Sequence, residues 1–308
     1  DHEIDQKSGP HDLASYAEIY TYAWTMFDLM VSAARTGIRF VVADRPNPLG
    51  GLVSEGPVLE PAWASFVGRA PVPVRHGLTA GELARHLNTS AVPQAAGQAV
   101  ELTVIEATGW RRAMDAEATG LPWIAPSPNI PTPATARVYP GTCLFEATNL
   151  SEGRGTTQPF EIVGAPYLDG RFTAALAELA LPGVHFRDLR YVPAFHKHAG
   201  RPLRGVQLHV TDREAFAPVR TAVAMLAVLR RLYPDDFAWH TADAGAEGTG
   251  HRHFIDLLWG SDRLRRAVDA GEDPLPLCDP PRPPGRWAGD DVLLYPADLS
   301  PCPEGSPR

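Results

Sequence analysis

The sequence is poor in cysteine, in positive charge and in long apolar runs, and each shortage excludes a class of protein. Three cysteines in 308 residues, with no C-x-x-C pair, exclude a disulfide framework and a cysteine-rich zinc site. Lys and Arg number 28 against 36 Asp and Glu, a net charge of -8, which argues against a nucleic-acid partner because phosphate binding needs a basic surface. No apolar run approaches the roughly 18 residues that a membrane-spanning helix needs.

Familiar catalytic signatures are also missing. The sequence has no G-x-S-x-G, no P-loop and no G-x-G-x-x-G after a strand, which removes the readily recognised serine hydrolases, NTPases and dinucleotide enzymes. Two histidine pairs, at residues 196 and 198 and at residues 251 and 253, lie beside cations without a nearby carboxylate. We therefore predict neither a metal site nor a cofactor.

Hydrophobic residues make up 44% of the chain, enough for a core, and their spacing predicts an α/β fold. Residues 15–35 predict a helix that buries Tyr22 with its neighbours at three- and four-residue steps, and Gly37 is suited to end it. The apolar, β-branched run at residues 38–43 predicts a buried parallel strand. A helix followed by such a strand is half of a doubly wound α/β unit.

The rest of the chain gives a second set of elements. Thr79-x-x-Glu82 is a capping box that starts a helix, and this alone explains Glu82. We predict an irregular, functional or connecting stretch at 121–157 and a mostly disordered Pro-rich tail after Asp273. The remaining predicted elements are strands at 101–106 and 206–210 and helices at 79–87, 214–232 and 261–270.

Residues 151–157 are the densest candidate for a site. Two glycines flank Arg154, so the backbone can approach a ligand closely, and Glu152 lies beside the guanidinium. Arg154 can hold Glu152 ionised, or Glu152 can act as an acid or base. The alternative is a turn tied by one ion pair.

Two proline-stiffened loops offer further polar groups. Arg45 and Asn47 follow the predicted strand, where ligands of open α/β sheets bind, although a rigid turn with Asp44 capping a backbone group explains the same residues. Asn129, between prolines in 127–132, could grip hydroxyl or acetamido groups, or make an ordinary Asx turn.

His76 precedes the capped helix and could face a ligand at its N-terminus, although an isolated histidine is more often structural. We further predict that the loops 44–51, 127–132 and 151–157 line one cleft, because each is polar and stiffened by Pro or Gly.

Several of these stretches, in this order, resemble the NamZ-like exo-β-N-acetylmuramidases, which are peptidoglycan glycoside hydrolases. The resemblance runs from about residue 18 to about residue 270. The matching stretches are Tyr20-Thr21-Tyr22, Asp44-Arg45-Pro46-Asn47-Pro48-Leu49-Gly50-Gly51, Ser127-Pro128-Asn129-Ile130-Pro131-Thr132 and Ser151-Glu152-Gly153-Arg154-Gly155-Thr156-Thr157, with residues 55–59, 65–68, 75–79, 109–110, 139–142, 164–166 and 205–212.

The resemblance implies a Rossmann-like catalytic domain followed by a smaller α/β domain, with the site in a cleft between them. We place the first domain at residues 1–165, the second at 166–272 and the tail at 273–308. The implied activity is release of N-acetylmuramic acid from the non-reducing end of peptidoglycan fragments, by a secreted or periplasmic protein. It makes Glu152 the catalytic candidate, with Tyr22, Arg45, Asn47, His76, Asn129 and Arg154 as substrate-binding residues.

One departure affects the expected activity. Family members carry an earlier segment with Gly-Pro-Glu-His-Gly, whose glutamate is a leading catalytic candidate, and this sequence has no such stretch. Because glycoside hydrolysis usually needs two carboxyl groups, we expect an incomplete Rossmann-like domain with impaired turnover, in which Glu152 orients the sugar. The alternative function is a non-catalytic, muropeptide- or sugar-binding remnant.

Overall fold

The computed structural model describes residues 21–241, 252–278 and 283–297. The chain forms two compact units that interleave along the sequence. Unit 1 contains residues 1–52, 77–131 and 284–308, and unit 2 contains residues 53–76 and 132–283. The sequence instead predicts domains that follow one another, at residues 1–165 and 166–272. Both units mix helices and strands, so the fold is α/β, as predicted.

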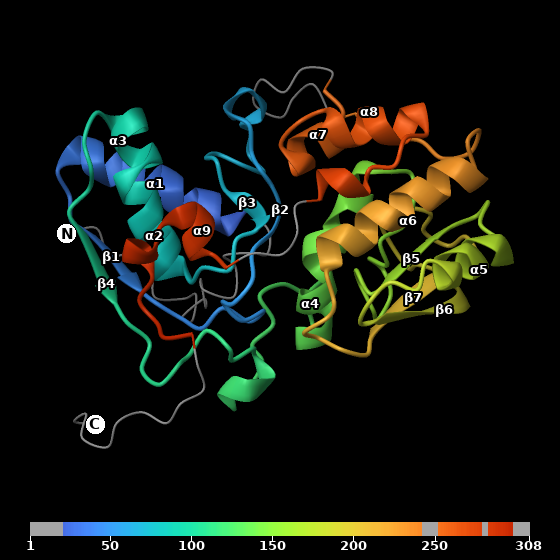
Figure 1. Cartoon of the computed structure of the whole chain (residues 1–308), viewed down its shortest axis with the longest axis horizontal. Helices are drawn as coiled ribbons and strands as arrows, with labels where there is room; N and C mark the ends of the chain where they lie inside the picture. Colours follow the sequence, from blue (N-terminus) through green and yellow to red (C-terminus); the bar gives the residue numbers. More distant parts are fainter. Residues whose placement is uncertain (1–20, 242–251, 279–282, 298–308) are drawn as a thin grey trace. The chain divides into compact units, whose positions relative to one another are not determined.

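Unit 1 is built on a parallel pair of strands. β1 (Phe40–Ala43) pairs with β4 (Leu102–Ile105) in parallel register. The chain between these strands includes α2 (Ala80–Thr89) and α3 (Ala91–Ala96), and α2 packs against both strands. α1 (Tyr22–Thr36) packs against α2 and α3, as Figure 1 shows. The predicted helix, parallel strand, capped helix and second strand are therefore confirmed.

The predicted buried faces of α1 and β1 are wrong. Tyr22 is 45% exposed, while Phe27 and Met30 are buried. Both sets of residues recur at helical spacing, and packing against α3, which the sequence could not indicate, decides which face is covered. Val41 of β1 is 49% exposed while Val42 is buried, because successive side chains of a strand point to opposite faces.

The capping box at the start of α2 is present and extends into a buried network. Thr79 accepts a hydrogen bond from the Glu82 backbone N–H, and the Glu82 carboxylate accepts one from Thr79 N–H. Asp44 completes the cap: its Oδ1 accepts from Gly81 N–H (2.8 Å) and its Oδ2 from the Thr79 hydroxyl (2.6 Å). Asp44 therefore caps the backbone, which is the alternative that the sequence left open.

The tail is folded where the structure describes it, which corrects the expectation of disorder for residues 283–297. Tyr295 donates a hydrogen bond to Asp44 Oδ2 at 2.7 Å, and its ring packs edge-on against Trp110. Leu294 N–H donates to the Glu82 carboxylate and Arg112 N–H to Pro296 O. Proline prevents long regular elements, yet it leaves aromatic rings and backbone groups free to pack. The short helix α9 (Gly285–Ala288) and the 3₁₀ turn η6 (Asp290–Val292) lie in this segment.

Unit 2 contains an antiparallel sheet with strand order β5-β7-β6. The long helix α6 packs against α4 and α5, and ten of its residues are buried. A two-stranded antiparallel pair, β2 with β3, belongs to the same unit. The bounds are β5 Ile162–Ala165, β6 Val184–Tyr191, β7 Leu203–Val210, β2 Glu55–Val58, β3 Pro73–Arg75, α4 Pro133–Thr142, α5 Gly170–Glu178, α6 Pro218–Leu232, α7 Phe254–Trp259 and α8 Arg263–Ala270.

The predicted strand at 206–210 and helices at 214–232 and 261–270 are confirmed as β7, α6 and α8. The expected irregular stretch at 121–157 is wrong where α4 and the 3₁₀ turn η4 (Cys143–Ala147) form. Thr132 caps α4 by accepting a hydrogen bond from Thr135 N–H. Gly141 lets α4 approach α6, since a Cβ there would lie 2.0 Å from Pro218 O. In the described residues, no helix is long and apolar enough to cross a membrane.

The tail contacts predict that residues 284–297 stabilise unit 1. A chain that ends at Pro283 loses the buried Tyr295 ring and the bonds to Asp44 and Glu82, so its free energy of unfolding should fall by about 3 kcal/mol or more. A chain that ends at Ala297 keeps these contacts and is the matched control. Urea denaturation measures both, and equal midpoints would refute the assigned role of the tail.

Candidate functional site

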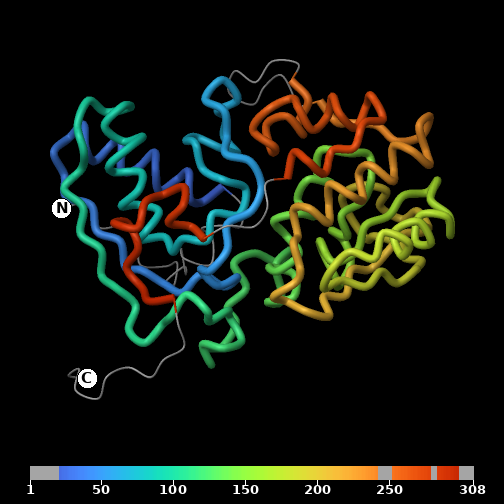
Figure 2. Tube along the Cα trace, viewed as in Figure 1, coloured from blue at the N-terminus to red at the C-terminus, as the bar shows by residue number. Residues whose placement is uncertain are grey.

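Residues 151–157 form a loop attached to the edge of the unit 2 sheet. Ser151 exchanges two backbone hydrogen bonds with Gly164 of β5, at 2.8 and 3.0 Å. Gly155 has a φ of 83°, and a Cβ there would lie 2.4 Å from Phe195 O. Ala194 N–H donates to Gly155 O at 2.7 Å. The absence of a side chain at Gly155 therefore lets residues 193–198 lie directly against the loop. Residues 193–198 belong to the connection between β6 and β7, which lies in the yellow-green part of the tube in Figure 2.

Glu152 is completely buried between three cationic or titratable groups. Its Oε1 accepts a hydrogen bond from Arg154 Nη1 at 3.0 Å and lies 3.2 Å from His196 Nδ1. Its Oε2 forms an ion pair with Lys197 Nζ at 3.0 Å. The exposed fraction of the Glu152 side chain is 0%, so solvent does not reach the carboxylate.

Lys197 and Arg154 extend this cluster to η4. Lys197 Nζ donates to three backbone carbonyls, those of Phe145 (2.9 Å), Glu146 (3.1 Å) and Leu150 (3.0 Å). Arg154 Nη2 donates to Glu146 Oε1 at 2.6 Å. The Glu152 cluster, defined as Glu146, Glu152, Arg154, His196 and Lys197, therefore ties three separate segments of unit 2 together.

The charges within the Glu152 cluster set its ionisation. Burial raises the pKa of Glu152, but the attraction of Lys197 and Arg154 outweighs burial and leaves the pKa below its ordinary value of 4.5. Burial lowers the pKa of Lys197, and Glu152 partly restores it. Burial raises the pKa of Glu146, against the attraction of Arg154. Glu152 is thus a permanent carboxylate at neutral pH, suited to orienting groups and unsuited to donating a proton.

Several sequence-predicted residues lie elsewhere. Asn47 is 0% exposed, and its amide is used within unit 1: Nδ2 donates to Leu78 O and Oδ1 accepts from Leu49 N–H, each at 2.9 Å. These hydrogen bonds hold the loop of Asn47 in place, and its expected contact with a substrate stays a prediction. Arg45 is exposed, His76 is buried at 3% exposure, and Tyr22 opens α1 with an exposed ring.

Asn129 is half-buried in a turn, where its backbone N–H donates to the Ser127 hydroxyl. Residues 44–51 and 127–131 belong to unit 1, whereas residues 151–157 belong to unit 2. The single cleft expected for the three loops stays a prediction. The substrate contacts expected for six residues stay predictions as well: Tyr22, Arg45, Asn47, His76, Asn129 and Arg154.

Sequence reasoning missed Lys197, His196 and Glu146. The sequence shows no carboxylate near residues 196–198, and in the fold Glu152 supplies one from a distant part of the chain. The signal was a run of three basic residues in a segment with no helical or strand periodicity. In the described residues, no three His, Cys, Asp or Glu side chains are arranged to hold a metal ion. The absence of a metal requirement stays a prediction.

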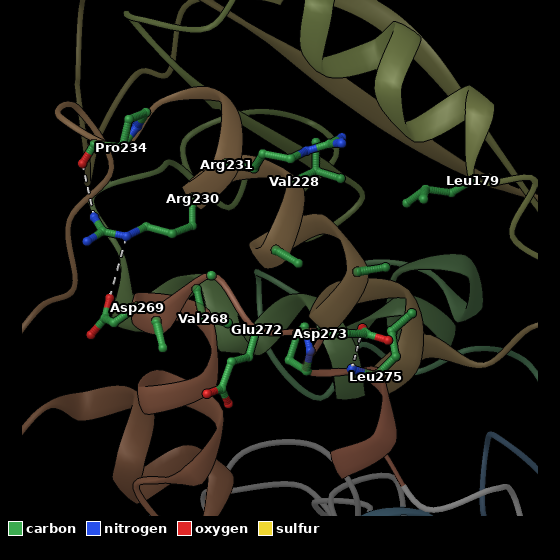
Figure 3. A pocket seen from close by; sticks show the side chains of 15 residues that line it. Leu179, Val228, Arg230, Arg231, Pro234, Val268, Asp269, Glu272, Asp273 and Leu275 are labelled. Carbon is green, nitrogen blue, oxygen red and sulfur yellow. Dashed lines mark hydrogen bonds and ion pairs between the residues drawn. The ribbon is translucent and has the colours of Figure 1, made fainter.

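A cavity of about 580 Å³ lies elsewhere in unit 2, along the C-terminal half of α6 and the end of α8. Figure 3 shows Arg230 reaching from α6 to Asp269 and to Pro234 O. None of the sequence-predicted site residues lines this cavity. The Glu152 cluster is therefore the stronger candidate.

Two family models match consecutive parts of the chain. The model described as exo-beta-N-acetylmuramidase NamZ, N-terminal, matches residues 17–134, and the C-terminal model matches residues 137–279. This chain belongs to the NamZ family. The Glu152 cluster lies within the match to the NamZ C-terminal model.

Individual relatives agree with this assignment. The chain is 48% identical over 253 residues to the peptidoglycan beta-N-acetylmuramidase NamZ of Bacillus subtilis (strain 168), covering 82% of this chain and 58% of that protein. It therefore spans less than two thirds of that NamZ protein. Two crystal structures of DUF1343 family proteins from Bacteroides fragilis NCTC 9343 are also similar. One has 31% identity and a TM-score of 0.73, covering 89% of this chain and 71% of its own. The other has 26% identity and a TM-score of 0.67, covering 91% and 73%.

The close contact between Gly155 and the backbone of Phe195 predicts that a side chain at position 155 destabilises the protein. Gly155→Ala combines a left-handed φ with a clash against the Phe195 backbone, so it should lower the free energy of unfolding by about 2–5 kcal/mol. Gly200→Ala is the matched control, because Gly200 has a φ of 73° and no atom within 4 Å of its Cβ position. It should cost about 1 kcal/mol. Equal losses in urea denaturation would contradict the close approach of the loops.

Glu152 and Glu146 should change the pH dependence of stability in opposite directions. Because the pKa of Glu152 lies below 4.5, its contribution is lost as the pH falls from 4.5 through the folded-state value. Because the pKa of Glu146 is raised above 4.5, stability falls as the pH rises from 4.5 through that value.

In urea titrations at a series of pH values, Glu152→Gln should therefore reduce the loss of unfolding free energy that the wild-type chain shows below pH 4.5. Glu146→Gln should remove the decline in unfolding free energy that the wild-type chain shows above pH 4.5. Parallel profiles for both variants would contradict the assigned ionisation.

Proposed function

We propose that the protein containing this chain is a glycoside hydrolase that releases N-acetylmuramic acid from the non-reducing end of peptidoglycan fragments. The observation that carries this proposal is the 48% identity to a peptidoglycan beta-N-acetylmuramidase over a region that includes the Glu152 cluster. The proposed substrates are peptidoglycan-derived sugars and muropeptides, and no cofactor is proposed.

The cluster suits substrate orientation in such a reaction. A glycosidase needs an acid that protonates the leaving oxygen, and such an acid has a raised pKa. The pKa of Glu152 is lowered, because the attraction of Lys197 and Arg154 outweighs the effect of burial. We therefore assign Glu152 to positioning, through Arg154 and the groups around it, and assign the proton-donating role to another residue.

A carboxylate that fixes the geometry of its neighbours contributes to rate because small misplacements of reacting groups are costly. A displacement of about 1 Å can cost about 10²-fold in rate. Loss of the Glu152 charge would remove the ionic contacts that Arg154, His196 and Lys197 share. The expected defect is therefore in turnover, with a folded protein.

Glu152→Gln tests this assignment. The wild-type chain, and a chimera that carries the earlier segment of the NamZ family ahead of it, are assayed for hydrolysis of a 4-nitrophenyl β-N-acetylmuramide. We expect turnover by the chimera and a loss of about 10²-fold or more in kcat/KM in its Glu152→Gln variant. His209→Ala, at an exposed position on β7, is the control and should leave kcat/KM unchanged.

Two other outcomes would change the proposal. A Glu152→Gln chimera with a normal rate would remove Glu152 from the site. A chimera that binds N-acetylmuramic acid and never hydrolyses the muramide would replace the glycosidase with the second candidate, a sugar-binding protein without catalysis.

A further inference from the structure

The Glu152 cluster reaches solvent chiefly through one side chain. The exposed fraction of the side chain is 0% for Glu152, 15% for Arg154, 16% for Lys197 and 19% for Glu146. For His196 it is 43%. Phe195, the preceding residue, is also 57% exposed. A ligand that approaches this cluster therefore meets His196 before it meets the buried carboxylate.

The contact with Glu152 determines which imidazole nitrogen faces the ligand. His196 Nδ1 lies 3.2 Å from Glu152 Oε1. An ionised carboxylate only accepts hydrogen bonds, so a neutral imidazole whose Nδ1 faces it is favoured as the Nδ1–H tautomer. In the neutral imidazole, Nε2 then holds a lone pair. Within the described part of the chain, Nε2 has no hydrogen-bond partner, so it is available as an acceptor.

The backbone of this segment is held in a costly conformation. His196 has a φ of 69° and His198 a φ of 57°, and Phe160, whose ring lies under Arg154, has a φ of 62°. Non-glycine residues in this region cost about 1–3 kcal/mol each and persist only when their surroundings fix them. The surroundings here are the Gly155 contact, the ion pair of Lys197 and the bond from His198 Nε2 to Asn149 O at 2.7 Å.

Burial, with help from the neighbouring cations, keeps His196 neutral near pH 7. Burial lowers the pKa of His196 below 6.5, Arg154 and Lys197 lower it further, and Glu152 opposes them. His240 also interacts electrostatically with His196. The neutral ring has the lone pair on Nε2 that the geometry requires.

We propose that His196 is the residue through which the Glu152 cluster contacts its sugar: Nε2 accepts a hydrogen bond from a hydroxyl group of N-acetylmuramic acid. Glu152 and Lys197 are then positioning residues, which fix the tautomer and the orientation of the ring. This inference rests on the proposed function for the substrate class, and goes beyond it in naming the contacting atom.

The test observes the imidazole and the sugar together. The full chain is labelled with ¹⁵N in histidine, and N-acetylmuramic acid is titrated into it at pH 7. We expect His196 to show the Nδ1–H tautomer, which Glu152→Gln should disturb because the carboxylate is removed. We further expect the sugar to shift the Nε2 resonance of His196.

Variants measure the contribution of the contact to binding. His196→Ala should weaken the Kd for N-acetylmuramic acid by up to roughly tenfold, the range of one hydrogen bond. His196→Gln, which retains an acceptor near the position of Nε2, should lose less. His209→Ala is the control and should leave the Kd unchanged. Circular dichroism of each variant establishes that it is folded.

The outcomes separate this inference from the function on which it rests. A folded wild-type chain that binds no N-acetylmuramic acid would overturn this inference, and the muramide assay decides the proposed function separately. Binding with an unshifted His196 Nε2 resonance and an unchanged Kd in His196→Ala would overturn this inference alone. An Nε2–H tautomer of His196 in the free chain would also overturn it, whatever the sugar does.

Discussion

The ion pair between Glu152 and Lys197 is the constraint on which the arrangement of unit 2 around the site depends. It joins the loop beside β5 to the connection between β6 and β7, and Lys197 extends it to the carbonyls of Phe145 and Glu146 in η4. Removing one partner of such a buried pair leaves an uncompensated charge and costs about 3–5 kcal/mol. A well-packed apolar pair would serve stability equally well, so the presence of charge here fits a role in fixing geometry.

Glycine and strained backbone make this ion pair possible. Gly155 allows the backbone of Phe195 to lie where a Cβ would be, and His196 and His198 adopt φ values that side chains disfavour. The result is that the Glu152 carboxylate is inaccessible to solvent, whereas the His196 imidazole that contacts it is half-exposed. Because Glu152 is held ionised, the cluster can orient hydrogen-bonding groups without itself exchanging protons at neutral pH.

The parts of the fold that local sequence determines were predictable. The capping box of Thr79 and Glu82, the left-handed Gly37 and Gly271, and the apolar pattern of α6 each act within one element. The wrong predictions concern contacts between residues far apart in the sequence. The buried face of α1 depends on packing against α3, and the order of the tail depends on the hydrogen bond from Tyr295 to Asp44. The site divides in the same way. Glu152 and Arg154 lie two residues apart in the sequence and were identified, whereas Lys197 and His196 reach Glu152 only through the fold.

The most direct test of this account is the pKa of the Glu152 carboxyl group, measured by ¹³C NMR of the side-chain carbonyl in glutamate-labelled chain and assigned with Glu152→Gln. The account predicts a pKa below 4.5 in the wild-type chain, and a higher value in Lys197→Met, which keeps the length of the side chain and removes its charge. A Glu152 pKa above 4.5 in the wild-type chain, unaffected by Lys197→Met, would show that the ion pair does not control the site.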